Sequence, residues 1–165
     1  MAAVDYFLKL DGIPGESQDA AHKDQIQLES FSWGLHNTAS AGATAGAHAG
    51  RASFEDFHFT KSVDKASPKL FFACASGQHI KSAILSCRKA GNVERGGQDF
   101  MMIKLENVLV SSYHDAGSQE VDDGLPQDSV ALNFTKITFT FTPQNADGAL
   151  GQPVTESWDL KSNKA

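Results

Sequence analysis

Apolar residues recur at every second position along most of the chain, which is the spacing of β-strands that bury one face. In one clear case Phe57 and Phe59 alternate with polar neighbours. Residues that favour turns separate such stretches from one another. The pattern predicts seven strands, over residues 4–10, 26–33, 51–60, 79–88, 99–110, 129–142 and 154–160.

Two of these predicted strands change face part-way along. In the second strand the apolar positions are even-numbered up to Leu28 and odd-numbered from Phe31. In the sixth strand they are even-numbered up to Phe134 and odd-numbered from Ile137. A strand that changes face needs a bulge, here near residues 29–30 in the second strand, and bulges are common where a sheet curves. The pattern therefore predicts a closed or nearly closed antiparallel barrel.

One short helix is predicted over residues 67–76. Ser67 fits the N-cap, Pro68 fits the first helical position and Gly77 fits the end of the helix. A helix of this length is not stable alone, so tertiary packing must hold it, and the pattern by itself favours a place across an open end of the barrel. The predicted core residues of the strands and the helix are Phe31, Trp33, Phe59, Phe72, Leu132, Phe134, Phe139 and Trp158.

Two long segments between the predicted strands are candidates for function. Residues 38–50 consist almost entirely of Ala, Gly, Ser and Thr, together with His48. Residues 111–127 are polar and acidic and form a predicted excursion from the barrel. Loops longer than about 12–15 residues in a small domain are usually either functional or disordered.

The composition fits one globular domain over residues 1–165. Apolar residues make up 41% of the chain and charged residues 21%, so the chain can form a core and is not a disordered acidic polymer. The net charge of −6 argues against nucleic acid or an anionic membrane as a partner, because both attract cationic surfaces. The chain has 11 Phe but 2 Tyr and 2 Trp, and because Phe has no polar tip this favours a core or a buried interface.

No motif for catalysis, cofactor binding or metal binding is present. The six histidines form no HxH, HxxxH or HExxH pair, and neither a GxSxG elbow nor a glycine-rich phosphate loop occurs. The two cysteines, Cys74 and Cys87, are too few for a disulfide framework. We therefore expect no catalytic residues, no cofactor and no metal, and a structural or binding role rather than an enzyme.

The amino-terminal residues do not resemble a targeting segment. Asp5 and Lys9 interrupt the first apolar stretch, and no basic segment precedes it. No stretch approaches the roughly 18 apolar residues of a membrane helix. We expect synthesis in the cytosol and no membrane insertion. Export by a route that needs no cleavable signal is also compatible with the sequence.

A series of short segments gives the chain a resemblance to a known family. In chain order they are Gly15-Glu16-Ser17, Phe31-Ser32-Trp33-Gly34, Phe59-Thr60-Lys61, Val63-Asp64-Lys65, Ser67-Pro68-Lys69-Leu70, Cys74-Ala75-Ser76-Gly77, Arg88-Lys89-Ala90-Gly91, Val108-Leu109-Val110-Ser111-Ser112, Leu132-Asn133-Phe134 and Ala146-Asp147-Gly148. Their order and spacing over nearly the whole chain resemble the haemolysin-coregulated protein (Hcp) family, the tube-forming proteins of bacterial type VI secretion systems.

The resemblance implies a mostly β fold: a barrel of two antiparallel sheets with one short helix, over residues 67–76, on its flank. It implies hexameric rings that stack into a hollow tube inside a contractile sheath. The tube is capped by a spike protein, is expelled from the cell and carries small effectors in its lumen. It also implies that the protein is made in the bacterial cytoplasm and secreted, without a cleavable signal peptide, to the medium or to a target cell.

Within this picture two sets of residues are assigned to surfaces of the ring. Ser30 and Ser32 are candidates for the lumen wall, the alternative being that they simply face solvent. The small-residue segment is the candidate for contact between stacked rings, the alternative being a disordered flap; its polar residues are Thr38, Ser40, Thr44 and His48.

Two other functions compete with the tube. The first is a monomeric barrel that binds an apolar ligand in its centre, which the 11 phenylalanines would also suit. The second is a small hydrolase with dispersed catalytic residues. The mass of the protein in solution separates the ring from the monomeric barrel.

Overall fold

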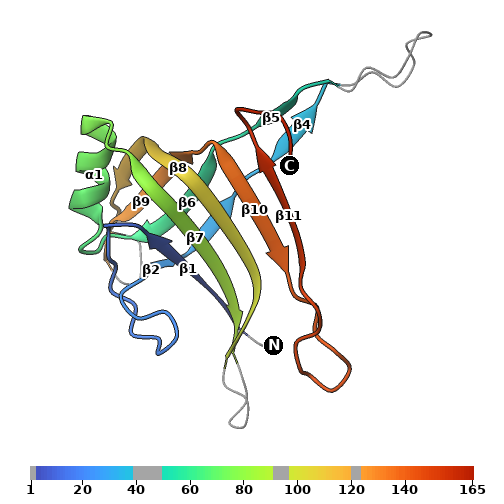
Figure 1. Cartoon of the computed structure of the whole chain (residues 1–165). Coiled ribbons are helices and arrows are strands. Elements are labelled where there is room, and N and C mark those ends of the chain that lie inside the picture. Colours follow the sequence, from blue (N-terminus) through green and yellow to red (C-terminus); the bar gives the residue numbers. More distant parts are fainter. Residues whose placement is uncertain (1–2, 39–49, 91–96, 120–123) are drawn as a thin grey trace.

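The computed structural model describes residues 3–38, 50–90, 97–119 and 124–165. Within them lie one helix, α1 (Ser67–Ser76), and a set of short and long strands (Figure 1). The strands are β1 (Val4–Leu10), β2 (Ile26–Leu28), β3 (Ser30–Ser32), β4 (Leu35–Asn37), β5 (Ala52–Phe54), β6 (Phe57–Ser62), β7 (Ile80–Lys89), β8 (Gln98–Ala116), β9 (Gln127–Asn133), β10 (Lys136–Phe141) and β11 (Val154–Asp159).

Two antiparallel sheets share the longest strand, β8. The first half of β8 pairs with β7 on one side and with β10 on the other, and from Leu109 onward β8 pairs with β9 (Figure 1). The first sheet therefore has the order β2-β1-β7-β8-β10-β11, and the second has the order β8-β9-β6-β3. The partner of β8 changes between Val108 and Leu109, and a bulge follows directly, between Val110 and Ser112.

Glu29 makes the second connection between the sheets. On one side of it β2 pairs with β1, and on the other side β3 pairs with β6. The backbone N–H of Glu29 donates a hydrogen bond of 2.8 Å to the carbonyl of Thr60. This bond keeps the chain paired with β6 at the residue where it changes face. The predicted face change near residues 29–30 is confirmed, and so is the mostly β fold of two antiparallel sheets.

The structure corrects three predicted boundaries. The predicted strand over 51–60 is two strands, β5 and β6, which pair in different sheets. The predicted strand over 129–142 is two strands, β9 and β10, which pair with different parts of β8. The chain crosses from one sheet to the other between them, at Phe134 and Thr135. The predicted polar loop over 111–127 is strand as far as Ala116. Both faces of the strand are exposed beyond Tyr113, so the sequence shows no alternation of apolar and polar residues there.

The helix has the predicted bounds but begins differently from the prediction. Gly77 ends it in the left-handed conformation, with φ of 68°, which glycine adopts without a steric penalty. The N-cap residue is Ala66, so the prediction of Ser67 as N-cap is wrong, because Ser67 already lies in the first turn. The helix lies on the flank of the barrel against β8 and not across an open end (Figure 1).

Only one face of α1 is buried. Ser67, Leu70 and Ala73 recur at every third position and face the barrel. Phe71 and Phe72 are outside the buried face and are 59% and 61% exposed. The prediction that Phe72 belongs to the core is therefore wrong: the helix is apolar nearly all round, so its sequence does not indicate which face packs.

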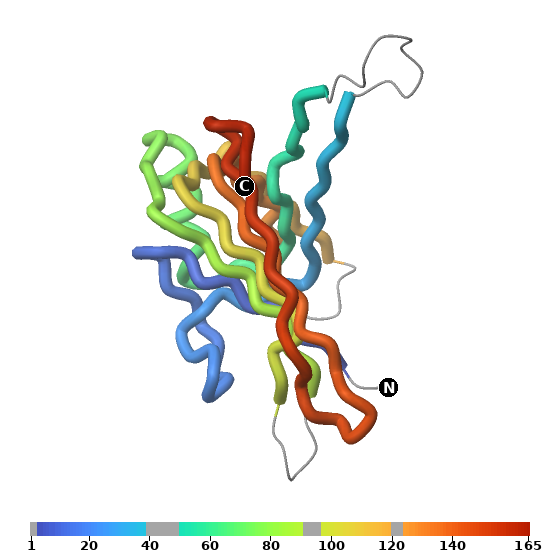
Figure 2. The backbone as a smooth tube through the Cα atoms, turned by 45° about the vertical axis from the view of Figure 1, so that its right-hand side comes forward, coloured from blue at the N-terminus to red at the C-terminus, as the bar shows by residue number. Residues whose placement is uncertain are grey.

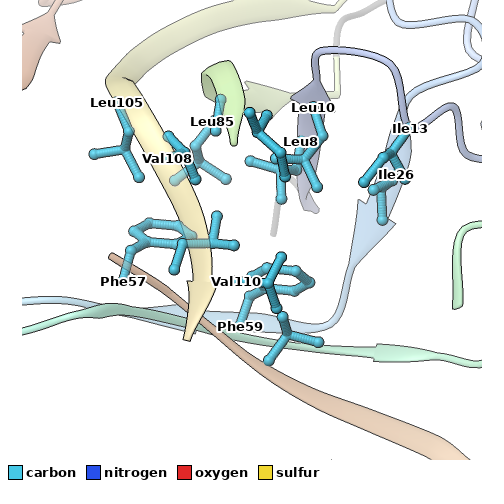
Figure 3. Packing of buried hydrophobic residues seen from close by; sticks show 14 of the residues in the cluster. Leu8, Leu10, Ile13, Ile26, Phe57, Phe59, Leu85, Leu105, Val108 and Val110 are labelled. Atoms are coloured by element: carbon cyan, nitrogen blue, oxygen red, sulfur yellow. The ribbon is translucent and has the colours of Figure 1, made fainter. Parts of the chain in front are cut away.

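The barrel interior is filled by side chains from both sheets. Figure 3 shows Phe57 and Phe59 of the second sheet facing the aliphatic side chains of the first sheet. Of the predicted core residues, Phe59, Leu132 and Phe134 are buried. The other predicted core residues of the strands are partly buried and pack against this cluster; they are Phe31, Trp33, Phe139 and Trp158.

A lysine lies fully buried at the junction of α1 and the second sheet. The ammonium group of Lys61, on β6, donates hydrogen bonds to Asp64 Oδ1 at 2.7 Å and to Ser67 Oγ at 2.9 Å. It also lies 2.8 Å from Asp128 Oδ2, on β9, and the side chains of Lys61 and Asp128 are both 0% exposed. A buried charge is tolerated only when it is paired, and two carboxylates pair this one.

Ser67 links this charge cluster to the helix. Its hydroxyl accepts the Lys61 hydrogen bond and donates one of 2.5 Å to Asp128 Oδ2. The backbone N–H of Asp64, in the turn before the helix, also donates to Ser67 Oγ at 3.0 Å. One ammonium group thus ties together β6, β9 and the first turn of α1, and we call these residues the Lys61 cluster: Lys61, Asp64, Ser67 and Asp128.

We predict that Lys61→Met lowers the free energy of unfolding by about 3–5 kcal/mol, because it leaves the Asp128 carboxylate buried without its cation. The measurement is urea unfolding at fixed protein concentration. Lys81→Met, at an exposed position on β7, is the matched control and should change the unfolding free energy by less than about 0.5 kcal/mol. Equal effects of the two substitutions would contradict the structural role of the cluster.

Candidate assembly surfaces

The outer face of the second sheet bears serine, threonine and histidine side chains. Ser30 and Ser32 of β3 are both exposed and lie opposite Thr60 and His58 of β6. The Ser30 and Thr60 hydroxyls are 2.5 Å apart. The row continues through Ser129 of β9 to His114 of β8. We call this surface the hydroxyl face; its residues are Ser30, Ser32, His58, Thr60, His114 and Ser129.

The strand that carries the predicted lumen residues sends its aromatic residue the other way. Phe31, between Ser30 and Ser32, packs edge-on against Tyr6 at 5.1 Å and stacks on Phe57 at 5.9 Å, measured between ring centroids. β3 therefore has a polar outer side, and aromatic packing on its inner side holds it against the barrel core. Whether Ser30 and Ser32 line a lumen stays a prediction.

The predicted ring-stacking segment lies largely beyond the part of the chain that the structure describes. Thr38 is exposed and follows directly after β4, whereas Ser40, Thr44 and His48 lie outside the described residues. β4 and β5, which flank the segment, pair in a two-stranded ribbon of their own. Figure 2 shows this ribbon projecting away from the barrel.

An apolar groove separates the β4–β5 ribbon from β10 and β11. It has a volume of about 690 Å³. The Trp33 and Phe139 rings pack at 5.7 Å on its wall, and Leu35 on β4 is 52% exposed at its rim. We call this the apolar groove; its main lining residues are Trp33, Leu35, Phe54, Ile137, Phe139 and Trp158.

On the other side of the barrel, α1 presents its two exposed phenylalanines. Phe71 packs edge-on against Tyr113 of β8, with 6.4 Å between the ring centroids. The Tyr113 hydroxyl in turn donates to Asp128 Oδ1 at 2.9 Å and to Asp115 Oδ1 at 3.1 Å. The aromatic pair is thus connected to the Lys61 cluster through one tyrosine.

The acidic residues of this region have shifted pKa values. Burial raises the pKa of Asp128, but hydrogen bonds with Asp115, Lys61 and Ser67 outweigh burial and hold it below the ordinary value of 3.8. The hydrogen bond to Asp128 raises the pKa of Asp115. Burial, followed by the hydrogen bond to Asp128, raises the pKa of Tyr113, so its hydroxyl stays protonated as a donor. The Lys61 cluster therefore keeps Asp128 ionised at neutral pH.

The described residues offer few groups for chemistry. Within them, no group of three or more His, Cys, Asp or Glu side chains could hold a metal ion. Burial raises the pKa of the Cys87 thiol to about 11, so this thiol is a poor nucleophile at neutral pH. In the same part of the chain, no helix has the length and apolar character to cross a membrane.

Comparison with known proteins gives the family. Residues 7–141 match the family described as "Type VI secretion system effector, Hcp". The chain belongs to the Hcp family. It is also 39% identical to protein hcp1 of Pseudomonas aeruginosa over 162 residues, which cover 98% of this chain and 98% of that protein.

Solved structures of related proteins share the fold. One, described as a type six secretion system protein, is 32% identical, covers 98% of this chain and 99% of its own, and gives a TM-score of 0.88. Hcp1 from Salmonella typhimurium is 32% identical, covers 99% of each chain and gives a TM-score of 0.77. The resemblance predicted from short sequence segments is therefore confirmed as family membership.

Sequence reasoning missed the Lys61 cluster and the apolar groove. A signal for the cluster was present, because Lys61 shares the parity of Phe57 and Phe59 and therefore points into the barrel. Asp128 likewise shares the parity of Val130 and Leu132. The groove had no such signal, since its walls come from β4, β5, β10 and β11.

We predict that stability falls as the pH is lowered below 3.8, because the pKa of Asp128 is lower in the folded state than this ordinary value. The unfolded state then binds more protons than the folded state, and the stabilisation present above 3.8 is lost as the pH falls through the folded value. Asp115, with its raised pKa, acts in the opposite direction, since its contribution is lost as the pH rises.

Urea unfolding as a function of pH checks this for wild type and for Asp128→Asn. The variant should be less stable at neutral pH and should show a shallower loss in acid. Asp11→Asn, at an exposed position, is the control and should keep the wild-type acid dependence. An acid dependence of Asp128→Asn as steep as that of wild type would exclude Asp128 as its source.

Proposed function

We propose that this chain is the tube-building subunit of a type VI secretion system. Six copies close into a ring, and rings stack into a hollow tube inside a contractile sheath. The tube is capped by a spike and expelled, and it carries small effectors in its lumen. No catalytic step, cofactor or metal belongs to this function.

The hydroxyl face is the observation that carries the proposal. It is a broad outer surface of one sheet that bears serine, threonine and histidine side chains. A lumen wall of this kind is hydrated and makes only small polar contacts with a protein that passes through. A large apolar surface would instead bind that protein. Ser30 and Ser32 lie on this wall, at the edge strand of the sheet.

The distribution of apolar surface also supports a ring. The exposed phenylalanines belong to α1, and the groove is lined by β4, β5, β10 and β11. These elements lie on different sides of the barrel (Figures 1 and 2). A protein whose two complementary surfaces face different directions associates head to tail, and such contacts close into rings when the rotation per subunit allows it.

The β4–β5 ribbon supports a contact between rings. It projects from the barrel and flanks the segment that contains Thr38, Ser40, Thr44 and His48. We assign that segment to the axial contact, where small residues allow close approach of two backbones.

A monomeric barrel that binds an apolar ligand is the second candidate. The barrel centre is occupied by Phe57, Phe59 and the aliphatic residues opposite them (Figure 3). An apolar ligand would therefore have to occupy the apolar groove outside the barrel.

We predict that the purified protein has six times the 17.7 kDa mass of one chain and forms annuli with a central hole. Light scattering coupled to size exclusion measures the mass, and negative-stain microscopy shows the annuli. A stable species of 17.7 kDa at all concentrations would reject the ring and favour the monomeric barrel.

We also predict that ring stacking increases with salt. Each chain carries a net charge of −6, so rings repel one another at low ionic strength. The Debye length falls from about 30 Å at 0.01 M salt to about 3 Å at 1 M, which screens this repulsion. Sedimentation should show longer stacks at high salt, whereas sucrose of equal osmolarity, the uncharged control, should not lengthen them. Equal stacking at both salt concentrations would refute the electrostatic control.

A further inference from the structure

Phe71 and Phe72 form an apolar patch that the barrel does not cover. Both side chains are more than half exposed although they are neighbours on a helix whose other face is buried. Phe is a large apolar side chain without a polar tip, so two of them side by side at the surface indicate an interaction site. We call these two residues the α1 patch.

The helix that carries the α1 patch, and the Phe71 ring within the patch, are held in place before they meet any partner. The Lys61 cluster fixes the first turn of the helix to β6 and β9. Phe71 rests edge-on against Tyr113, whose hydroxyl is held by Asp128. Little conformational freedom is lost when such a preorganised patch binds, which favours its use as an interface anchor.

The apolar groove offers a matching receptor surface. Its volume of about 690 Å³ exceeds by several times the roughly 150 Å³ cavity that holds one benzene molecule. Trp33 and Phe139 present aromatic walls on which phenylalanine rings can stack or pack edge-on. The groove therefore has both the room and the chemistry for two phenyl rings.

The charges beside the two surfaces are opposite in sign. Lys69 is exposed on α1 three residues before Phe72, so it lies beside the patch on the helix surface. Glu156 is exposed on β11 and lines the groove. This local attraction favours a partner with the same sequence despite the net charge of −6, and it specifies which two surfaces meet.

The arrangement of the two surfaces fixes the type of assembly. Figures 1 and 2 show α1 on a different side of the barrel from β4, β5, β10 and β11, the strands whose residues line the groove, so the α1 patch of one chain cannot reach the groove of that chain. Contact of the patch of one copy with the groove of the next is heterologous and continues from subunit to subunit. Contact of patch with patch would instead be isologous and would stop at a dimer.

We infer that, in the ring, α1 of each subunit inserts Phe71 and Phe72 into the apolar groove of its neighbour. This inference rests on the proposed ring, and it specifies which surfaces form the lateral contact. Lys69 then pairs with Glu156 of the adjacent copy at the edge of the contact.

The first test is Phe72→Ser, compared with Val154→Ser. Both positions are 61% exposed, and Val154 does not line the groove. Phe72→Ser should raise the concentration at which rings dissociate by at least about tenfold, with an unchanged circular dichroism spectrum. Val154→Ser should leave that concentration at the wild-type value. Equal ring stability of the two variants would overturn the inference.

Charge exchange tests the pairing at the edge of the contact. Lys69→Glu and Glu156→Lys should each lower the fraction of protein in rings, and the double variant should restore it. A double variant no more assembled than the weaker single variant would contradict the pairing of these two surfaces.

Disulfide trapping distinguishes the two possible contacts, in a Cys74→Ser background. Phe72→Cys combined with Leu35→Cys should give, on oxidation, a ladder of covalent multimers up to six chains, and either substitution alone should give monomers. Covalent dimers from Phe72→Cys alone would indicate that α1 patches pair with each other and would overturn the inference. The mass of the wild-type protein separates failure of this inference from failure of the proposed ring. If wild type has the mass of six chains, the ring is supported even when these tests exclude the contact. If wild type is a monomer, the ring itself is rejected.

Discussion

The buried ammonium group of Lys61 determines where the helix lies. It is placed on the inward face of β6, where only a paired charge is tolerated. Its partners come from β9, from the turn before α1 and from the first turn of α1, so satisfying one charge fixes three parts of the chain. Because α1 is too short to be stable alone, this cluster and the packing of Leu70 and Ala73 hold it on the flank.

The placement of α1 and the closure of the barrel together define the outer surfaces. Glu29 and β8 carry the chain between the two sheets, so the second sheet has an aromatic inner face and a hydroxyl outer face. The helix leaves Phe71 and Phe72 exposed on one side, and the β4–β5 ribbon creates an apolar groove on another. The chain thus presents a polar face and two separate apolar surfaces, from which we propose its assembly into stacked rings.

Period-two alternation was enough to predict the barrel and the face change at residues 29–30, because both depend on local spacing. It also predicted a face change between Phe134 and Ile137, but it did not show that the chain breaks into two strands there, because only the pairing with β8 shows that the chain has changed sheets. Phe72 was misplaced because α1 is apolar nearly all round. Lys61 could have been found from its parity with Phe59, whereas the groove could not, because its walls are far apart in the sequence.

In the assembly that we propose, identical subunits meet head to tail through α1, and the hydroxyl face is turned toward the lumen. The most direct measurement is electron cryo-microscopy of the assembled wild-type protein at a resolution that shows side chains. We expect six-fold rings in which Phe72 of one subunit lies against Trp33 and Trp158 of the next, with Ser32 at the wall of the central channel. Rings with α1 on the outer rim, free of the neighbouring subunit, would contradict this assembly.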